Sequence, residues 1–120
     1  MKNENPRIEW AENSGKQCLK FTFGEKLTTQ EAEVAIAEWQ KAFQSKKDTS
    51  IILIWDCREM RGYDSDARVK WTDALKEMKS QIDSIWLISA SSAIKIGASV
   101  MSFFSNLDIK PISCESEIVV

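Results

Sequence analysis

The chain has 120 residues, of which 43% are hydrophobic and 28% are charged, with a net charge of −2 and a pI near 5.2. This size and composition are typical of a single domain. The mildly acidic balance argues against nucleic acid and anionic membranes as partners, because both attract concentrated basic surfaces. The sequence contains no histidine, the commonest general base and metal ligand. It therefore disfavours hydrolases of the usual designs, metal sites and cofactors.

The longest apolar runs, IILIW and IWLI, are far shorter than the roughly 20 residues that span a bilayer. The charged start MKNENPRIEW contains no apolar segment of signal-peptide type. Three cysteines, Cys18, Cys57 and Cys114, are an odd and unclustered set, which argues against a disulfide framework or a zinc site. We expect a cytoplasmic protein with reduced thiols and no membrane span.

The first predicted elements are a hairpin and a helix. Segments RIEWAE and KQCLKFTFG alternate around NSG, a three-residue turn whose glycine can adopt a positive φ. Leu19, Phe21 and Phe23 then share one face. In LTTQEAEVAIAEWQKAF, Thr28 and Glu31 form a capping-box pattern ahead of apolar residues at helical spacing, which predicts an amphipathic helix. Its apolar positions are Ala32, Ala35, Ile36, Trp39 and Phe43.

A buried strand, a second helix and another buried strand are predicted next. Residues 51–56, IILIWD, are apolar on both faces, as expected of a parallel strand that is covered on both sides. Residues 65–82 have a helical apolar pattern, and residues 84–89, SIWLIS, form the next strand. The apolar side of this second helix consists of Ala67, Trp71, Ala74, Leu75, Met78 and Ile82.

A third helix from Ser92 to Asn106 and a short last strand complete the predicted fold. Pro111 favours an edge position or the start of that strand, in residues 109–115. The order of elements predicts one α/β domain with a mixed, mostly parallel sheet of about five strands. It begins with an N-terminal hairpin, and three helices form right-handed crossovers.

The third helix has more apolar surface than one sheet contact requires. One stripe contains Ile94, Gly97, Ala98, Met101 and Phe104, and Gly97 would also permit a close backbone approach. A second stripe consists of Ile96, Val100, Phe103 and Leu107. Either residues 116–120 or a neighbouring helix cover it within the chain, or it is an apolar interface for a homodimer, a protein partner or a lipid-like ligand.

The turn that leaves the first buried strand is unusually charged. Asp64 or Ser65 can cap the second helix, and Asp66 in its first turn complements the helix dipole. Capping does not explain Arg58 and Arg61, which either pair with nearby acids or face a partner. Loops at the carboxyl ends of parallel strands converge at one edge, where sites form. The predicted partner-binding residues are Arg58, Arg61, Asp64, Ser65, Asp66, Arg68, Ser91 and Ser92.

Parts of the sequence resemble the receiver domain of response regulators. Asp56 ends a central strand, MRG follows it, and Ser89, Ala90, Lys110 and Pro111 look like other parts of that phosphoacceptor site. The order of elements differs, because the acidic pair after the first strand and one strand and helix are missing. We therefore disfavour a receiver.

A resemblance over nearly the whole chain is to the STAS domain, the fold of bacterial anti-sigma factor antagonists and of sulfate transporter tails. IILIWD resembles the strand that precedes its D-S-[S/T]-G box, and Asp64 and Ser65 match the first two positions of that box. Asp66 stands at the phosphoacceptor position and Ala67 at the glycine. The resemblance is closest to a divergent bacterial group, and the substitution at Asp66 puts the kinase switch in doubt.

Other residues have simpler explanations. The five tryptophans, Trp10, Trp39, Trp55, Trp71 and Trp86, are predicted on buried faces, although Trp55 and Trp86 could line a pocket. Cys57 is expected to be unreactive, with a lowered pKa as the less favoured alternative. Ser89, Ser91 and Ser92 are expected to cap the third helix or to contact the charged edge.

These features predict a non-catalytic, STAS-like protein-interaction module. The resemblance implies a signalling partner, such as an anti-sigma factor or a kinase, and self-association is a further possibility. The alternative is a small-molecule or lipid-binding module that uses the apolar surface of the third helix.

Overall fold

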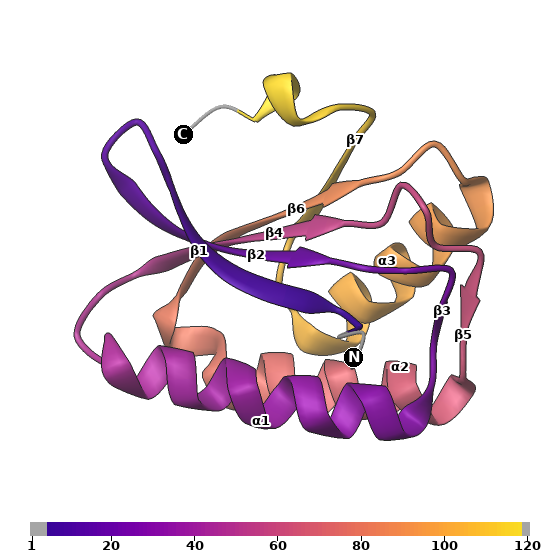
Figure 1. Ribbon diagram of the computed structural model, residues 1–120, viewed down its shortest axis with the longest axis horizontal. Helices are drawn as coiled ribbons and strands as arrows, with labels where there is room; N and C mark the ends of the chain where they lie inside the picture. Colours follow the sequence, from indigo (N-terminus) through magenta and orange to yellow (C-terminus); the bar gives the residue numbers. More distant parts are fainter. Residues whose placement is uncertain (1–4, 119–120) are drawn as a thin grey trace, which may run out of the picture.

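The computed structural model describes residues 5–118 and contains a five-stranded mixed sheet with the order β1-β2-β4-β6-β7 (Figure 1). The strands are β1 (Arg7–Asn13), β2 (Lys16–Thr22), β4 (Ile51–Asp56), β6 (Ile82–Ile88) and β7 (Ile109–Ile112). The β1–β2 pair is antiparallel, and the other pairs are parallel. The predicted sheet, its N-terminal hairpin and the edge position of the last strand are confirmed.

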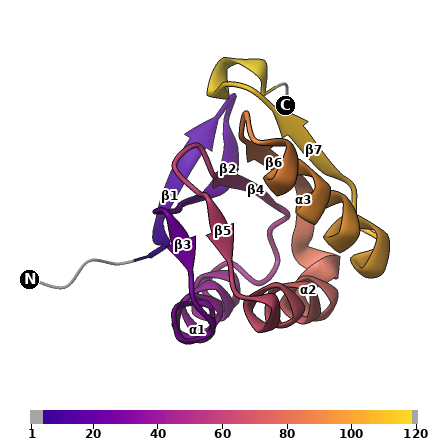
Figure 2. The same cartoon turned by 90° about the vertical axis from the view of Figure 1, so that its right-hand side faces the viewer.

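All three long helices cover the same face of the sheet. They are α1 (Thr29–Ser45), α2 (Ser65–Met78) and α3 (Ser92–Ser105), and Figure 2 shows α1 beside α2 and α2 beside α3. Along the chain, each parallel strand is added on the same side of the one before it. Because the crossovers between these strands share one handedness, their helices all lie on one face of the sheet. The sheet therefore has no point at which the strand order reverses, where open α/β sheets usually bind ligands.

The helix-side core is built around aromatic rings. Trp39 and Trp71 lie 5.2 Å apart between ring centroids, and Phe21 meets Trp39 edge-on at 5.4 Å. Trp55 packs against Trp71 at 6.2 Å. Side chains from β2, β4, α1 and α2 thus interlock here, as the alternation in the strands and the helical spacing predict.

The second face of the sheet is covered without a long helix. Its buried side chains include Ile54, Ile88 and Ile118, the last of which follows the 3₁₀ turn η2 (Glu115–Glu117). Figure 1 shows η2 on the side of the sheet away from α1 and α2. The prediction that β4 is covered on both sides is confirmed, with the C-terminal segment as part of the second cover.

A two-stranded parallel sheet formed by β3 (Lys26–Leu27) and β5 (Gly62–Tyr63) was not predicted. Each strand lies just before a helix, so their pairing holds the starts of α1 and α2 together. Figure 2 shows these strands beside each other. Two-residue strands have no recognisable apolar period, which explains why the sequence does not reveal them.

Local predictions near element ends need two corrections. Ile82 begins β6, because α2 ends at Met78 and the 3₁₀ turn η1 (Lys79–Gln81) follows. The hairpin turn has two residues instead of three, and Ser14 and Gly15 both have positive φ. Such a turn matches the twist of the paired strands.

Two predicted core positions are exposed. Trp10, 38% exposed, lies on the edge strand β1 with the Lys46 ammonium 5.9 Å from its ring centroid. Phe104 was assigned to the buried stripe of α3 but is 61% exposed, and Ser105 occupies the buried position instead. The Ser105 hydroxyl donates to the Met101 carbonyl at 2.6 Å, which satisfies its polar group inside the core.

Candidate functional site

Asp56 and Arg58 form an intramolecular ion pair at the end of β4. The Arg58 guanidinium donates to both carboxylate oxygens, from Nη2 at 2.6 Å and from Nε at 2.9 Å, and the Arg58 backbone N–H adds a contact at 3.2 Å. These hydrogen bonds lower the pKa of Asp56, which is 6% exposed. Arg58 is thus engaged within the turn, although its side chain is 54% exposed.

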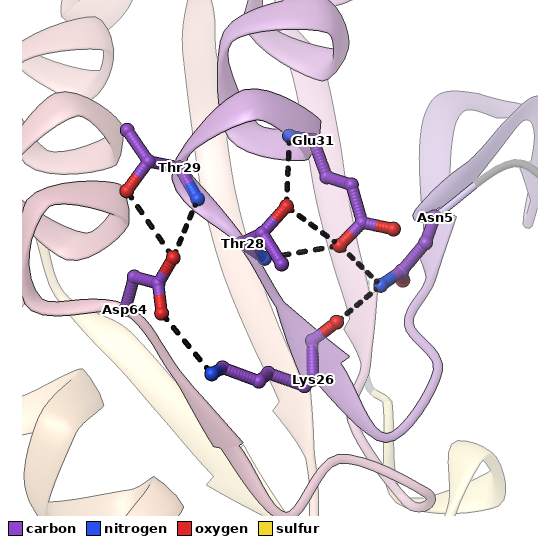
Figure 3. Close-up of polar contacts among 6 residues, drawn as sticks. All are labelled: Asn5, Lys26, Thr28, Thr29, Glu31 and Asp64. Carbon is purple, nitrogen blue, oxygen red and sulfur yellow. Dashed lines mark hydrogen bonds and ion pairs between the residues drawn. The ribbon is translucent and has the colours of Figure 1, made fainter.

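Asp64 connects the starts of the two helices α1 and α2. It occupies the N-cap position of α2 but makes no side-chain hydrogen bond to that helix. Its Oδ2 instead accepts from the Thr29 backbone N–H at 2.9 Å and from the Thr29 hydroxyl at 3.3 Å, and Oδ1 lies 3.3 Å from Lys26 Nζ (Figure 3). Of the two predicted caps, Asp64 rather than Ser65 thus occupies the N-cap position, but its side chain bonds to α1, which the β3–β5 pairing brings within reach.

Further polar contacts strengthen the start of α1. Thr28 and Glu31 make the predicted capping box, and Asn5 donates to the Lys26 carbonyl at 2.5 Å and to Glu31 at 3.3 Å (Figure 3). The Asn5 side-chain oxygen also accepts from the Gly24 N–H at 2.8 Å. The charged turn and the start of α1 are therefore joined by one connected network of polar contacts, which holds them together.

The remaining predicted partner-binding residues differ in their exposure and in the internal contacts that they make. Ser65, Asp66 and Ser92 are exposed, each in the first turn of its helix. Ser91 accepts from the Ile94 N–H at 3.3 Å and caps α3, as predicted. Arg61 is exposed, and within residues 5–118 its guanidinium has no ion-pair partner.

Arg68 is half-buried beside α3, and Ser89 is buried with its hydroxyl accepting from the Ser91 N–H at 3.0 Å. The turn and the start of α3 are held by separate contacts. In the part of the chain that the structure describes, no hydrogen bond joins the Arg58–Asp56 pair to Ser91 or Ser92.

The thiol beside the charged turn is poorly suited to reaction. Cys57 is 3% exposed, and burial raises the pKa of its thiol to about 12. The alternative of a lowered pKa is therefore wrong. All three cysteines are free, and only Cys114 is exposed. Among residues 5–118, no three His, Cys, Asp or Glu side chains are grouped as a metal site requires.

The outer face of α3 carries large exposed apolar side chains. Phe103 is 80% exposed and Ile96 65%, with half-buried Val100 between them. Phe104 extends this face, and its ring meets that of Phe103 edge-on at 5.3 Å between centroids. Leu107 lies beyond the end of α3 and packs partly on the helix-side core. We call Ile96, Val100, Phe103 and Phe104 the outer face of α3.

Up to Ile118, the C-terminal segment does not cover this outer face. Ile118 packs on the opposite face of the sheet, against Ile52 and Ile112. Val119 and Val120 lie outside the described residues. Within residues 5–118, the second apolar stripe therefore remains exposed at Ile96 and Phe103.

Behind α3 lies a small apolar cavity of about 40 Å³. It lies beside the carboxyl ends of β4 and β6, and its walls include Trp55, Leu87, Ile94, Met101 and Arg68. Trp86 cannot line the same cavity, because it faces the second side of the sheet, where the Lys110 ammonium lies 4.8 Å from its ring centroid.

One contact at the rim of this cavity was only partly predicted. A Cβ atom at Gly97 would collide with the Tyr63 hydroxyl oxygen, so the glycine leaves space for the tyrosine ring against α3. Close approach at Gly97 was predicted for a backbone, whereas a side chain from β5 makes it. The sequence pattern indicated that something approaches Gly97 closely, but it did not indicate that Tyr63 does so.

No helix among residues 5–118 has both the length and the apolarity needed to cross a bilayer. Neither protein-family models nor curated proteins match the sequence.

Among solved structures, the chain is similar to an uncharacterised protein of the DUF3478 family with a SpoIIAA-like fold from Shewanella loihica PV-4. The match has a TM-score of 0.76 and 14% identity, and covers 98% of this chain and 93% of the other. At this identity the match shows the fold alone. The chain therefore has a SpoIIAA-like fold, which is the STAS-like architecture that its sequence predicts.

Proposed function

We propose that this protein is a non-catalytic interaction module that binds a protein through the outer face of α3. The observation that carries the proposal is the exposure of Ile96, Phe103 and Phe104 on one helix. These three side chains leave on the order of 400 Å² of apolar surface in contact with water, as much as the largest patch of an ordinary monomer. Such a patch is typical of a binding surface.

The chemistry of the charged turn supports binding over catalysis. Asp56 and Asp64 are committed to internal hydrogen bonds, and Cys57 stays protonated at neutral pH. The turn therefore offers no free base or nucleophile among its buried groups. Its exposed Arg61, with Ser65 and Asp66 at the start of α2, remains available to a partner.

A signalling role is the finer part of the proposal. Ser65 is the first residue of α2, where a phosphate would be stabilised by free backbone N–H groups. Asp66 beside it already adds a negative charge to the same turn. Mass spectrometry of protein purified from its native cells tests this role, and an unmodified Ser65 under all growth conditions would count against a phosphorylation switch.

Affinity capture from native cells tests the proposed surface. The bait proteins are the wild type, a Phe103→Asp variant and a Val34→Asp variant. Val34 is 61% exposed on α1 and serves as a matched control for adding a charge to an exposed apolar position. We expect proteins that bind the wild type and the Val34 variant but not the Phe103 variant. Identical captures with all three baits would contradict the proposal.

A second candidate function is the binding of an apolar ligand behind α3, favoured by the apolar cavity there. A volume of about 40 Å³ is well below the roughly 300 Å³ of a small ligand pocket. A ligand would therefore have to displace α3 outward. Native mass spectrometry distinguishes the candidates, because a copurifying apolar molecule that is lost on Ala98→Trp substitution would favour the ligand site.

A further inference from the structure

The large side chains on the outer face of α3 are evenly spaced along the helix. Val100 lies midway between Ile96 and Phe104, four residues from each, and Phe103 lies beside Phe104. The face thus has a bulky apolar group near each end and a smaller one at its centre. When two such helices lie antiparallel about an axis at Val100, Ile96 of each is placed beside Phe104 of the other.

We propose that the partner of this face is a second copy of the chain, bound with the two α3 helices antiparallel about a two-fold axis near Val100. This inference rests on the proposed function and names the partner for the same surface. Ile96 of each copy then packs against Phe103 and Phe104 of the other. An interface of this kind is isologous, and each copy contributes the same residues to it.

The charges at the two ends of α3 complement this arrangement. Lys95 is the only charged residue in Ser92–Ser105, and Asp108 is exposed just after the helix. Within residues 5–118 neither of them has an ion-pair partner. In the antiparallel pair, Lys95 approaches the carboxyl end of the partner helix, where Asp108 of the other copy and the helix dipole are both negative. A parallel pair would instead bring like charges together.

The available area fits a dimer of modest affinity. The outer face supplies about half of the roughly 800 Å² that each partner contributes to a standard interface. A neighbouring groove of about 230 Å³ between α2 and α3 adds more surface, with Val69, Thr72, Val100 and Phe104 among its lining residues. Because Val69 is 53% exposed and lies beside Phe104, it extends the apolar surface onto α2.

The surrounding charges favour a second copy over an anionic membrane. Arg68 and Lys76 line the groove together with Asp73, and Lys95 and Asp108 lie at the two ends of α3, so the basic and acidic groups are nearly balanced. A surface that binds anionic lipids needs a concentrated cluster of basic residues, which these interspersed charges do not form.

Sedimentation velocity over a hundredfold range of concentration tests the proposal. We expect the wild type and the Val34→Asp control to dimerise, and Phe103→Asp and Ile96→Asp to remain monomeric with unchanged circular dichroism. Lys95→Glu should weaken the dimer at least several-fold, and the Lys95→Glu/Asp108→Lys double variant should restore it. A monomeric wild type at every concentration, or dimers that survive both apolar substitutions, would overturn the inference.

Cross-linking tests the antiparallel orientation in a Cys114→Ser background, which removes the exposed native thiol. An Ile96→Cys protein should form a disulfide with a Phe104→Cys protein under mild oxidation, and not with itself. Self-linking of the Ile96→Cys protein alone would overturn the antiparallel arrangement.

The two proposals fail in different ways. If the wild type is monomeric but Phe103→Asp still loses captured proteins, the face binds another protein and only the dimer is wrong. If neither dimerisation nor capture depends on Phe103, the proposed function falls as well.

Discussion

The carboxylate of Asp64, at the start of α2, accepts a hydrogen bond of 2.9 Å from the backbone N–H of Thr29, at the start of α1. A residue in the N-cap position of one helix thus satisfies a free N–H group of another. The same carboxylate pairs with Lys26, which lies in β3. The relative position of two helices and the β3–β5 sheet therefore depends in part on one side chain.

Substitution of Asp64 should lower stability through this link. The Thr29 hydrogen bond lowers the pKa of Asp64. We expect Asp64→Ala to reduce the urea midpoint of unfolding and Asp64→Asn to reduce it less, because an amide oxygen still accepts from Thr29 but loses the charge opposite Lys26. Ser65→Ala, at an exposed neighbouring position, is the control. An unchanged midpoint for Asp64→Ala would show that the link contributes nothing.

The Asp56–Arg58 pair should make stability depend on pH. The Arg58 hydrogen bonds hold the folded-state pKa of Asp56 below its unfolded value of about 3.9. The stabilisation is therefore fully present above about pH 4 and is lost as the pH falls through the folded-state pKa. Free energies of unfolding between pH 2 and pH 6 should show a smaller acid-induced loss for Asp56→Asn than for the wild type.

The same pair predicts unequal effects for the two arginines of the turn. Arg58→Met should cost about 1 kcal/mol, which is below the usual range for charged hydrogen bonds because the Arg58 side chain is 54% exposed and water can replace it. Arg61→Met should change stability by less than about 0.5 kcal/mol. Chemical denaturation at neutral pH measures both, and equal effects would contradict the distinction.

These contacts show which interactions the sequence could reveal. The capping box of Thr28 and Glu31 was predicted because both residues lie within one helical turn. The bond between Asp64 and Thr29 spans 35 residues and depends on a pair of two-residue strands, for which the sequence has no periodic signal. The strands and helices were predicted because their apolar spacing repeats over many residues.

The third helix shows a second limit. Its all-round apolarity predicted cover on more than one side, and Ile94 and Ala98 do pack on the core. Phe103 and Phe104 both face solvent, and Ser105 takes the buried position in place of Phe104. Which of two adjacent residues is buried depends on the angle at which the helix meets the sheet and α2, and the apolar pattern does not give that angle.

Gly97→Ala tests the contact between α3 and Tyr63. Alanine would favour the helix by about 1 kcal/mol over glycine, but its Cβ would collide with the Tyr63 hydroxyl. We expect a net destabilisation of about 1–2 kcal/mol, part of which is recovered in Gly97→Ala/Tyr63→Phe. Gly62→Ala is the control, since nothing lies within 4 Å of the Cβ built there. A stabilised Gly97→Ala protein would show that the ring moves aside freely.

The C-terminal segment should contribute to stability by covering the second face of the sheet. Ile118 is 9% exposed and packs with Ile52 and Ile112, and Lys20 pairs with Glu115 at 2.8 Å nearby. We expect Ile118→Ala to cost about 2 kcal/mol, near the lower limit for a buried isoleucine because the site lies at the rim. Val34→Ala, at an exposed position, should cost less than about 0.5 kcal/mol. Thermal and urea unfolding compare the two.

Thiol labelling should report the difference between the three cysteines. Cys18 and Cys57 are buried, and burial raises the pKa of both thiols, to about 12 for Cys57. At mildly alkaline pH their reactive thiolate forms are scarce and shielded from reagent, so only Cys114 should react rapidly in the folded protein. A Cys114→Ser variant should then label only at the rate of unfolding, and denaturant should expose both remaining thiols together. Rapid labelling of Cys57 in the folded variant would instead mean that α3 opens readily and gives solvent access to the apolar cavity behind it.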